Sequence, residues 1–63
     1  MSHQHDDAIL TMATYFVDNC ILKIGRSSHS IDPALRYELI QWKANQIADL
    51  LDSFLNDLEQ YSA

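Results

Sequence analysis

The 63-residue sequence has one cysteine, one glycine, one proline and only four basic residues, and each shortage excludes something. A single cysteine, Cys20, cannot form an intramolecular disulfide, and no pattern of cysteine and histidine suits a structural zinc site. A domain of this size buries only roughly 60% of the surface that its unfolded chain exposes. We therefore expect oligomerisation to supply the stability that disulfides and metals do not.

Long hydrophobic runs are also missing, so the sequence predicts neither a transmembrane span nor a secretory signal, and we expect a cytoplasmic protein without membrane contacts. Nine acidic residues against four basic ones give a net charge of −5. The basic residues do not form a cluster in the sequence; they are Lys23, Arg26, Arg36 and Lys43. This balance argues against a nucleic-acid partner, because phosphates repel an acidic surface.

A long helix over about residues 33–60 is the strongest structural signal. Asp32 is a suitable N-cap, and Pro33 suits the first helical position because its missing N–H would have no partner there. No glycine or proline follows Pro33. Apolar residues recur at alternating spacings of three and four, which predicts a heptad seam along one side of this helix. The seam is Tyr37, Ile40, Ala44, Ile47, Leu51, Phe54, Leu58 and Tyr61.

A shorter helix over about residues 7–24 precedes it. Asp6 or Asp7 can cap its start, and Gly25 suits the left-handed residue that closes a helix. Its apolar arc spans nearly half of the circumference, which is wider than the arc of an ordinary surface helix. We expect the central stripe to be Ile9, Ala13, Phe16 and Cys20. Cys20 is therefore predicted to be a small, buried, structural residue.

Together these elements predict one all-α domain over residues 1–63, an antiparallel helical hairpin with a flexible tail at residues 1–5. The second helix, at roughly 42 Å, is longer than the first, at roughly 27 Å, so its carboxyl-terminal part lacks an intramolecular partner. We expect a second copy to cover it, forming a homodimeric four-helix bundle. The predicted dimer interface is Phe16, Leu51, Phe54, Leu58 and Tyr61.

A second apolar stripe lies away from the heptad seam. It consists of Leu35, Leu39 and Trp42 on the long helix, with a smaller counterpart of Tyr15 and Leu22 on the short one. This stripe is either a further contact between copies or a docking site for a different protein, with Trp42 as its anchor. The opposite face of the long helix is acidic, which is typical of a solvated surface.

No arrangement of residues predicts catalysis or a cofactor. Ser28 and His29 lie in the connector without an orienting acid, so we do not expect an enzyme. His3 and His5 belong to the predicted tail, and Asp49 and Asp52 have no histidine beside them. We therefore expect no catalytic residue, no metal site and no cofactor.

Residues 10–15, Leu-Thr-Met-Ala-Thr-Tyr, resemble the early part of the first helix of the plasmid copy-number regulator Rop. The resemblance covers about six residues and implies a hairpin that dimerises into a four-helix bundle. That family binds RNA through a basic face with an aromatic residue. Here Tyr15 is present, but its surroundings are Thr11, Thr14 and Asp18, without a row of cations. The analogy therefore extends to shape, and RNA binding is not implied.

The sequence thus favours a small acidic homodimeric protein–protein interaction module. The leading hypothesis is a regulator or inhibitor of the phage or mobile-element type that binds a larger protein. The alternatives are a nucleic-acid-associated regulator similar to Rop and a purely structural assembly subunit.

Overall fold

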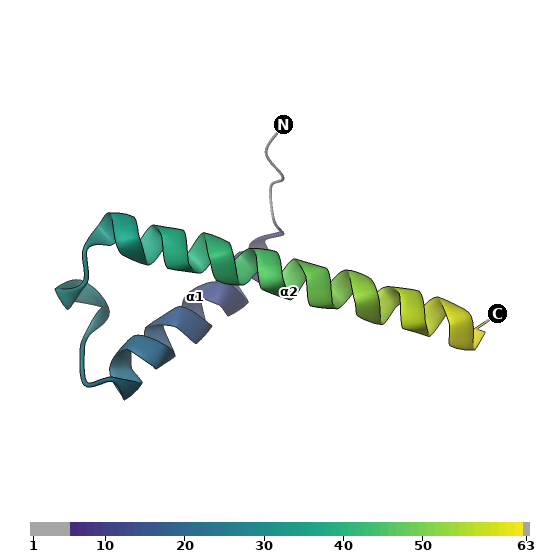
Figure 1. Cartoon of the computed structure of the whole chain (residues 1–63), viewed down its shortest axis with the longest axis horizontal. Helices are drawn as coiled ribbons and strands as arrows, with labels where there is room; N and C mark the ends of the chain where they lie inside the picture. The colour runs from purple at the N-terminus through teal and green to yellow at the C-terminus, as the bar shows by residue number, and fades with distance from the viewer. Residues whose placement is uncertain (1–5, 63) are drawn as a thin grey trace.

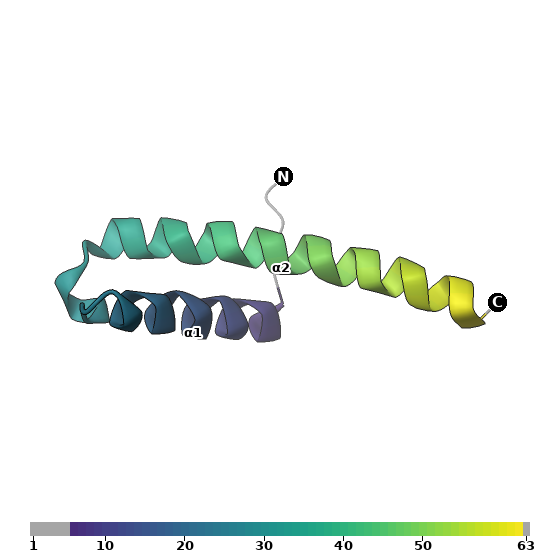
Figure 2. The same cartoon turned by 60° about the horizontal axis from the view of Figure 1, so that its bottom comes forward.

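The computed structural model describes residues 6–62, and these form an all-helical chain without strands. Helix α1 comprises Asp7–Lys23, helix α2 comprises Pro33–Ser62, and a short 3-10 helix, η1, comprises Ser28–Ser30 between them. The helices run antiparallel, and α2 continues well past the amino-terminal end of α1 (Figures 1 and 2). The predicted hairpin is confirmed. The predicted tail at residues 1–5 lies outside the described residues.

The two helix boundaries at the connector follow from local signals. Gly25 has φ of +81°, and its backbone N–H donates to Leu22 O at 2.9 Å while the N–H of Arg26 donates to Ile21 O at 3.1 Å. These two bonds form a Schellman motif, which satisfies carbonyls that the helix leaves free at its end. Pro33 is the first residue of α2, and Asp32 O accepts the N–H of Arg36 at 3.0 Å. Both predicted boundaries are therefore confirmed to within one residue.

The core between the helices is small. Among the described residues six side chains are buried, four from α1 and two from α2, and none is larger than isoleucine; they are Ile9, Ala13, Val17, Ile21, Ile40 and Ala44. Ile47 and Ala48 pack partly against this cluster, and Leu10, Ile31 and Leu39 do the same. Ala13 and Ala44 have no exposed surface. A core of this size gives the isolated hairpin marginal stability.

The packing stripe expected on α1 is wrong in its second half. Val17 and Ile21 are buried where Phe16 and Cys20 were expected, and Cys20 is exposed. The buried residues of α1 recur at intervals of four, as do Ile40 and Ala44 on α2. Rows at intervals of four interdigitate when helices cross obliquely, whereas a heptad seam suits helices that run nearly parallel. Figure 1 shows this crossing, with the helices diverging towards the connector.

The heptad seam of α2 is also only partly used. Ile40, Ala44 and Ile47 contact α1, but Tyr37 is exposed although it begins the seam. Tyr37 is in the second turn of α2, and α2 diverges from α1 towards the connector (Figure 1). The oblique crossing therefore removes it from the core.

Candidate protein-interaction surfaces

The carboxyl-terminal part of α2 presents the largest group of exposed apolar side chains. We call residues 49–62 the overhang, because α1 does not extend alongside them (Figure 2). Its large apolar residues are all exposed: Leu50, Leu51, Phe54, Leu55, Leu58 and Tyr61. On a helix of 3.6 residues per turn, Leu51 and Leu58 continue the row that begins with buried Ile40 and Ala44. The core-facing side of α2 therefore extends beyond the core without a cover.

A second apolar surface lies along one side of α1. We call Met12, Phe16 and Cys20 the Phe16 edge; they follow one another at intervals of four, and all three are exposed. Phe16 is 50% exposed, and the Lys43 Nζ lies 3.9 Å from the centroid of its ring. Lys43 Nζ also donates to Gln46 Oε1 at 3.1 Å. The cation covers part of the ring, in a cation–π contact of the kind found at protein surfaces.

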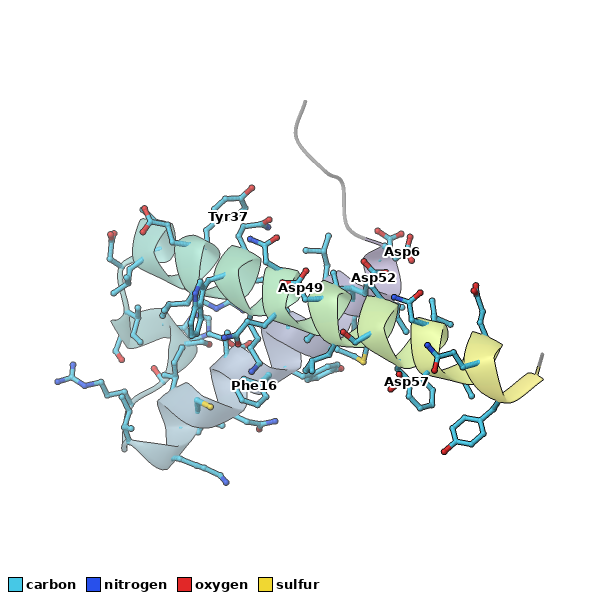
Figure 3. All side chains as sticks on the ribbon, turned by 45° about the vertical axis from the view of Figure 1, so that its right-hand side comes forward. Asp6, Phe16, Tyr37, Asp49, Asp52 and Asp57 are labelled. Atoms are coloured by element: carbon cyan, nitrogen blue, oxygen red, sulfur yellow. The ribbon has the colours of Figure 1, made fainter. Side chains whose placement is uncertain are left out.

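The overhang and the Phe16 edge share a side of the hairpin. Figure 3 shows Phe16 and Asp57 on one side of α2, and Tyr37 on the other. The ammonium group of Lys43 reaches Phe16, and residues seven and eleven positions after Lys43 lie on the same side of α2; these are Leu50 and Phe54. Four of the five residues expected at a dimer interface are in the overhang, and the fifth is Phe16. All five are exposed in the single chain.

The second apolar stripe is divided by the structure. We call Leu35 and Trp42 the Trp42 edge; they lie on one side of α2, about two helical turns apart, and Trp42 is 61% exposed. Leu39, which was expected to join them, is partly buried against the core. Tyr15 and Leu22 on α1 are both exposed. The Trp42 edge faces away from the row containing Ile40, since two residues correspond to 200° of rotation at about 100° per residue.

One ion pair links the helices, and the sequence reasoning missed it. Arg36 donates from Nε and Nη2 to the two carboxylate oxygens of Asp18, both at 2.9 Å. The hydrogen bond from Arg36 is the main cause of the lowered pKa of Asp18; partial desolvation opposes it, and the charges of Arg36 and His29 add smaller lowering effects. Asp18 and Arg36 are equally distant in sequence from Ser27 in the connector. That symmetry in an antiparallel hairpin is the signal that could have predicted the pair.

The surface shows no sign of a metal site within residues 6–62. No group of three or more His, Cys, Asp or Glu side chains in this range could hold a metal ion. Neither α1 nor α2 contains a stretch long and apolar enough to cross a membrane. No family model, curated protein or solved structure matches this chain. The function must therefore be inferred from the exposed surfaces themselves.

Proposed function

We propose that this protein is a homodimeric helical interaction module that regulates or inhibits a larger protein. In this proposal two copies associate through their apolar surfaces into an arrangement of four helices, and the dimer presents the Trp42 edge to its target. The observation that carries the proposal is that the folded hairpin leaves two separate apolar surfaces of α2 exposed: the overhang and the Trp42 edge, which is rotated by about 200° from the core-facing row. Small proteins seldom expose several large apolar groups without a use for them.

Self-association is supported by the overhang. The exposed leucines of the overhang continue the buried row of α2. An isolated segment of this kind is only marginally stable as a helix in water, because most helix stability in proteins comes from packing an apolar face. A second copy supplies that packing symmetrically, as in most small oligomers. The four-helix bundle expected from the sequence is the usual arrangement of two such hairpins.

Binding of a different protein is supported by the Trp42 edge. Trp42 and Leu35 lie away from both the core and the overhang's apolar row, so a dimer can form without covering them. Large aromatic residues are enriched among the anchors of protein interfaces. Acidic Glu38 and Asp49 flank Trp42 on α2, four residues before it and seven after it.

The nucleic-acid alternative receives no support from the described side chains. Arg36 is paired with Asp18, and Lys43 lies over the ring of Phe16. Two of the four cations therefore already have contacts within the hairpin, and the net charge of −5 opposes phosphate binding.

Affinity capture from the native host, with mass spectrometry of the retained proteins, tests target binding. We expect wild-type protein to retain a target that Trp42→Ala loses, with a cost of roughly 2 kcal/mol or more, as is usual for an anchor residue. Tyr37→Ala is the matched control, because Tyr37 is an equally exposed aromatic residue on a different side of α2. Retention of the same proteins by both variants would reject the Trp42 edge as the target site.

Fluorescence distinguishes target binding from self-assembly at the same residue. Emission from Trp42, the only tryptophan, should be red-shifted and easily quenched in the free dimer, and should shift to the blue when a target binds. A shielded tryptophan in the free dimer, together with loss of the dimer in Trp42→Ala, would instead assign this edge to the contact between copies.

A further inference from the structure

The basic residues of the hairpin all lie at one end, whereas acidic residues, among them Asp18, Asp32 and Glu38, occur at both ends. The overhang contains four acidic residues and no lysine or arginine; the acids are Asp49, Asp52, Asp57 and Glu59. All four basic residues lie within residues 23–43, at the end where α1 and α2 pack together. A contact between copies can therefore bring the acidic groups of the overhang close to the basic residues of the other copy or close to its acidic overhang.

Two of these basic residues lie at the Phe16 edge. Lys43 lies over the Phe16 ring, and Lys23 follows Phe16 by seven residues, which places it on the same side of α1. The overhang carries the opposite charge: Asp57 follows Phe54 by three residues and points to the same side of the hairpin as Phe16 (Figure 3). The overhang thus combines exposed apolar side chains with acidic groups, and the Phe16 edge combines them with two lysines.

We propose that the overhang of each copy docks on the Phe16 edge of the other copy, in an antiparallel pair with two identical contacts. This inference rests on the proposed dimer and names the surfaces that it joins. Apolar Phe54 meets the partner subunit's Phe16, and Asp57 approaches the lysines of the same edge. Twofold symmetry makes the contact twice, so a single pair of complementary surfaces serves both copies.

The opposing arrangement, in which the two overhangs pair with each other, is disfavoured by charge. It brings together two segments that each carry four acidic groups and no cation. Such like-charge contact weakens association, most strongly at low ionic strength. It also leaves the Phe16 edges of both copies uncovered. Docking on the Phe16 edge covers both apolar surfaces with one kind of contact.

Parallel, in-register pairing is disfavoured by the fold itself. In each copy α1 occupies the core-facing side of α2 along its first half (Figure 2). Two parallel α2 helices that joined these sides at their overhangs would force the two α1 helices into the same space. An antiparallel pair avoids this, because each overhang then lies beside the paired half of the other copy.

Cysteine cross-linking measures the arrangement directly, because Cys20 lies in the Phe16 edge and is the only native cysteine. We expect Asp57→Cys to form a disulfide-linked dimer under mild oxidation, and the same substitution combined with Cys20→Ser to form none. A disulfide requires Cα atoms within about 7 Å, so the bond reports proximity of the two surfaces. The wild-type protein should remain unlinked, because the two Cys20 residues are not opposite each other in this pair.

A charge variant gives an independent reading by sedimentation equilibrium. Asp57→Asn should raise the dimer dissociation constant by up to about tenfold, since the symmetric dimer contains the contact twice and exposed ion pairs are individually weak. Asp49→Asn is the matched control; Asp49 belongs to the same overhang but lies on another side of α2 (Figure 3). Its neutralisation should leave the dimer unchanged or strengthen it slightly by reducing the net charge.

The outcomes separate this inference from the proposed dimer. A chain that sediments as a folded monomer at micromolar concentration would overturn both. A dimer in which Asp57→Cys cross-links equally well with Cys20→Ser would overturn this inference in favour of paired overhangs, while self-association would stand. A dimer that cross-links in neither variant, or that Asp57→Asn strengthens, would also overturn the docking on the Phe16 edge.

Discussion

Because α1 packs through one of two possible apolar stripes, substitutions at the adjacent residues Cys20 and Ile21 should differ in their effect on the stability of the fold. Ile21 is buried, with 4% of its surface exposed, whereas adjacent Cys20 is exposed. Ile21→Ala removes three buried carbon atoms, which corresponds to roughly 2.4 kcal/mol of lost transfer free energy at about 0.8 kcal/mol each. The cavity that remains raises the cost, and substitutions of this kind fall at about 2–5 kcal/mol. Cys20→Ala should change the stability of the fold by less than about 0.5 kcal/mol.

Urea denaturation followed by circular dichroism measures this difference, with all variants at one protein concentration because a dimer's stability depends on it. A loss of this size is comparable to the roughly 3–5 kcal/mol that the core of so small a domain supplies. Ile21→Val therefore provides a milder step of about 1 kcal/mol. The midpoint should fall for Ile21→Val and stay near the wild-type value for Cys20→Ala. The reasoning would be refuted if Cys20→Ala lowered the midpoint as much as Ile21→Val does.

Three further predictions concern the ion pair, the connector and the overhang. Because the Arg36 hydrogen bond lowers the folded-state pKa of Asp18, the pair should stabilise the fold above about pH 4. This stabilisation should be lost as the pH falls through the lowered pKa. In Asp18→Asn, the urea midpoint should therefore depend less on pH in this range. Gly25→Ala should cost about 1–2 kcal/mol in thermal unfolding, because φ is +81° and an added Cβ meets nothing within 4 Å, so strain alone acts. Leu58→Asp should leave a monomer or an unfolded chain in sedimentation equilibrium, and an intact dimer at wild-type affinity would contradict the role of the overhang.

The positions of the helices were predictable because their signals are local. An Asp-Pro pair at residues 32–33 and the single glycine at residue 25 act through backbone geometry within a few residues, whatever the rest of the chain does. The exposure of Trp42 was predictable for a similar reason. Its rotation from Ile40 follows from helix geometry once one residue of the core-facing row is known.

The packing of α1 was less predictable, because its wide apolar arc offers two stripes. Phe16 and Cys20 continue from Ala13 at intervals of three and four, whereas Val17 and Ile21 continue at intervals of four. Which stripe is buried depends on the crossing angle of the helices, and that angle is a property of both helices together. The same dependence explains why Leu39 was expected on the exposed stripe and is partly buried instead.

The two buried alanines connect this crossing to the surfaces proposed for interaction. Ala13 and Ala44 have no exposed surface, and small side chains at a helix contact allow the two backbones to lie close together. Oblique packing about a close contact makes the helices diverge on either side of it. On the connector side the helices diverge (Figure 1), and both Tyr37 and the Phe16 edge are exposed. On the other side α1 ends and the core-facing row of α2 continues into the overhang.

Ala44→Leu should therefore do more than overpack the core, at a cost of about 1–3 kcal/mol. By pushing the helices apart at this buried position it should also change the spacing of the Phe16 edge and Lys43, and so weaken association of the copies in sedimentation equilibrium. A variant that lost stability but kept wild-type dimer affinity would show that the crossing and the docking surface are independent.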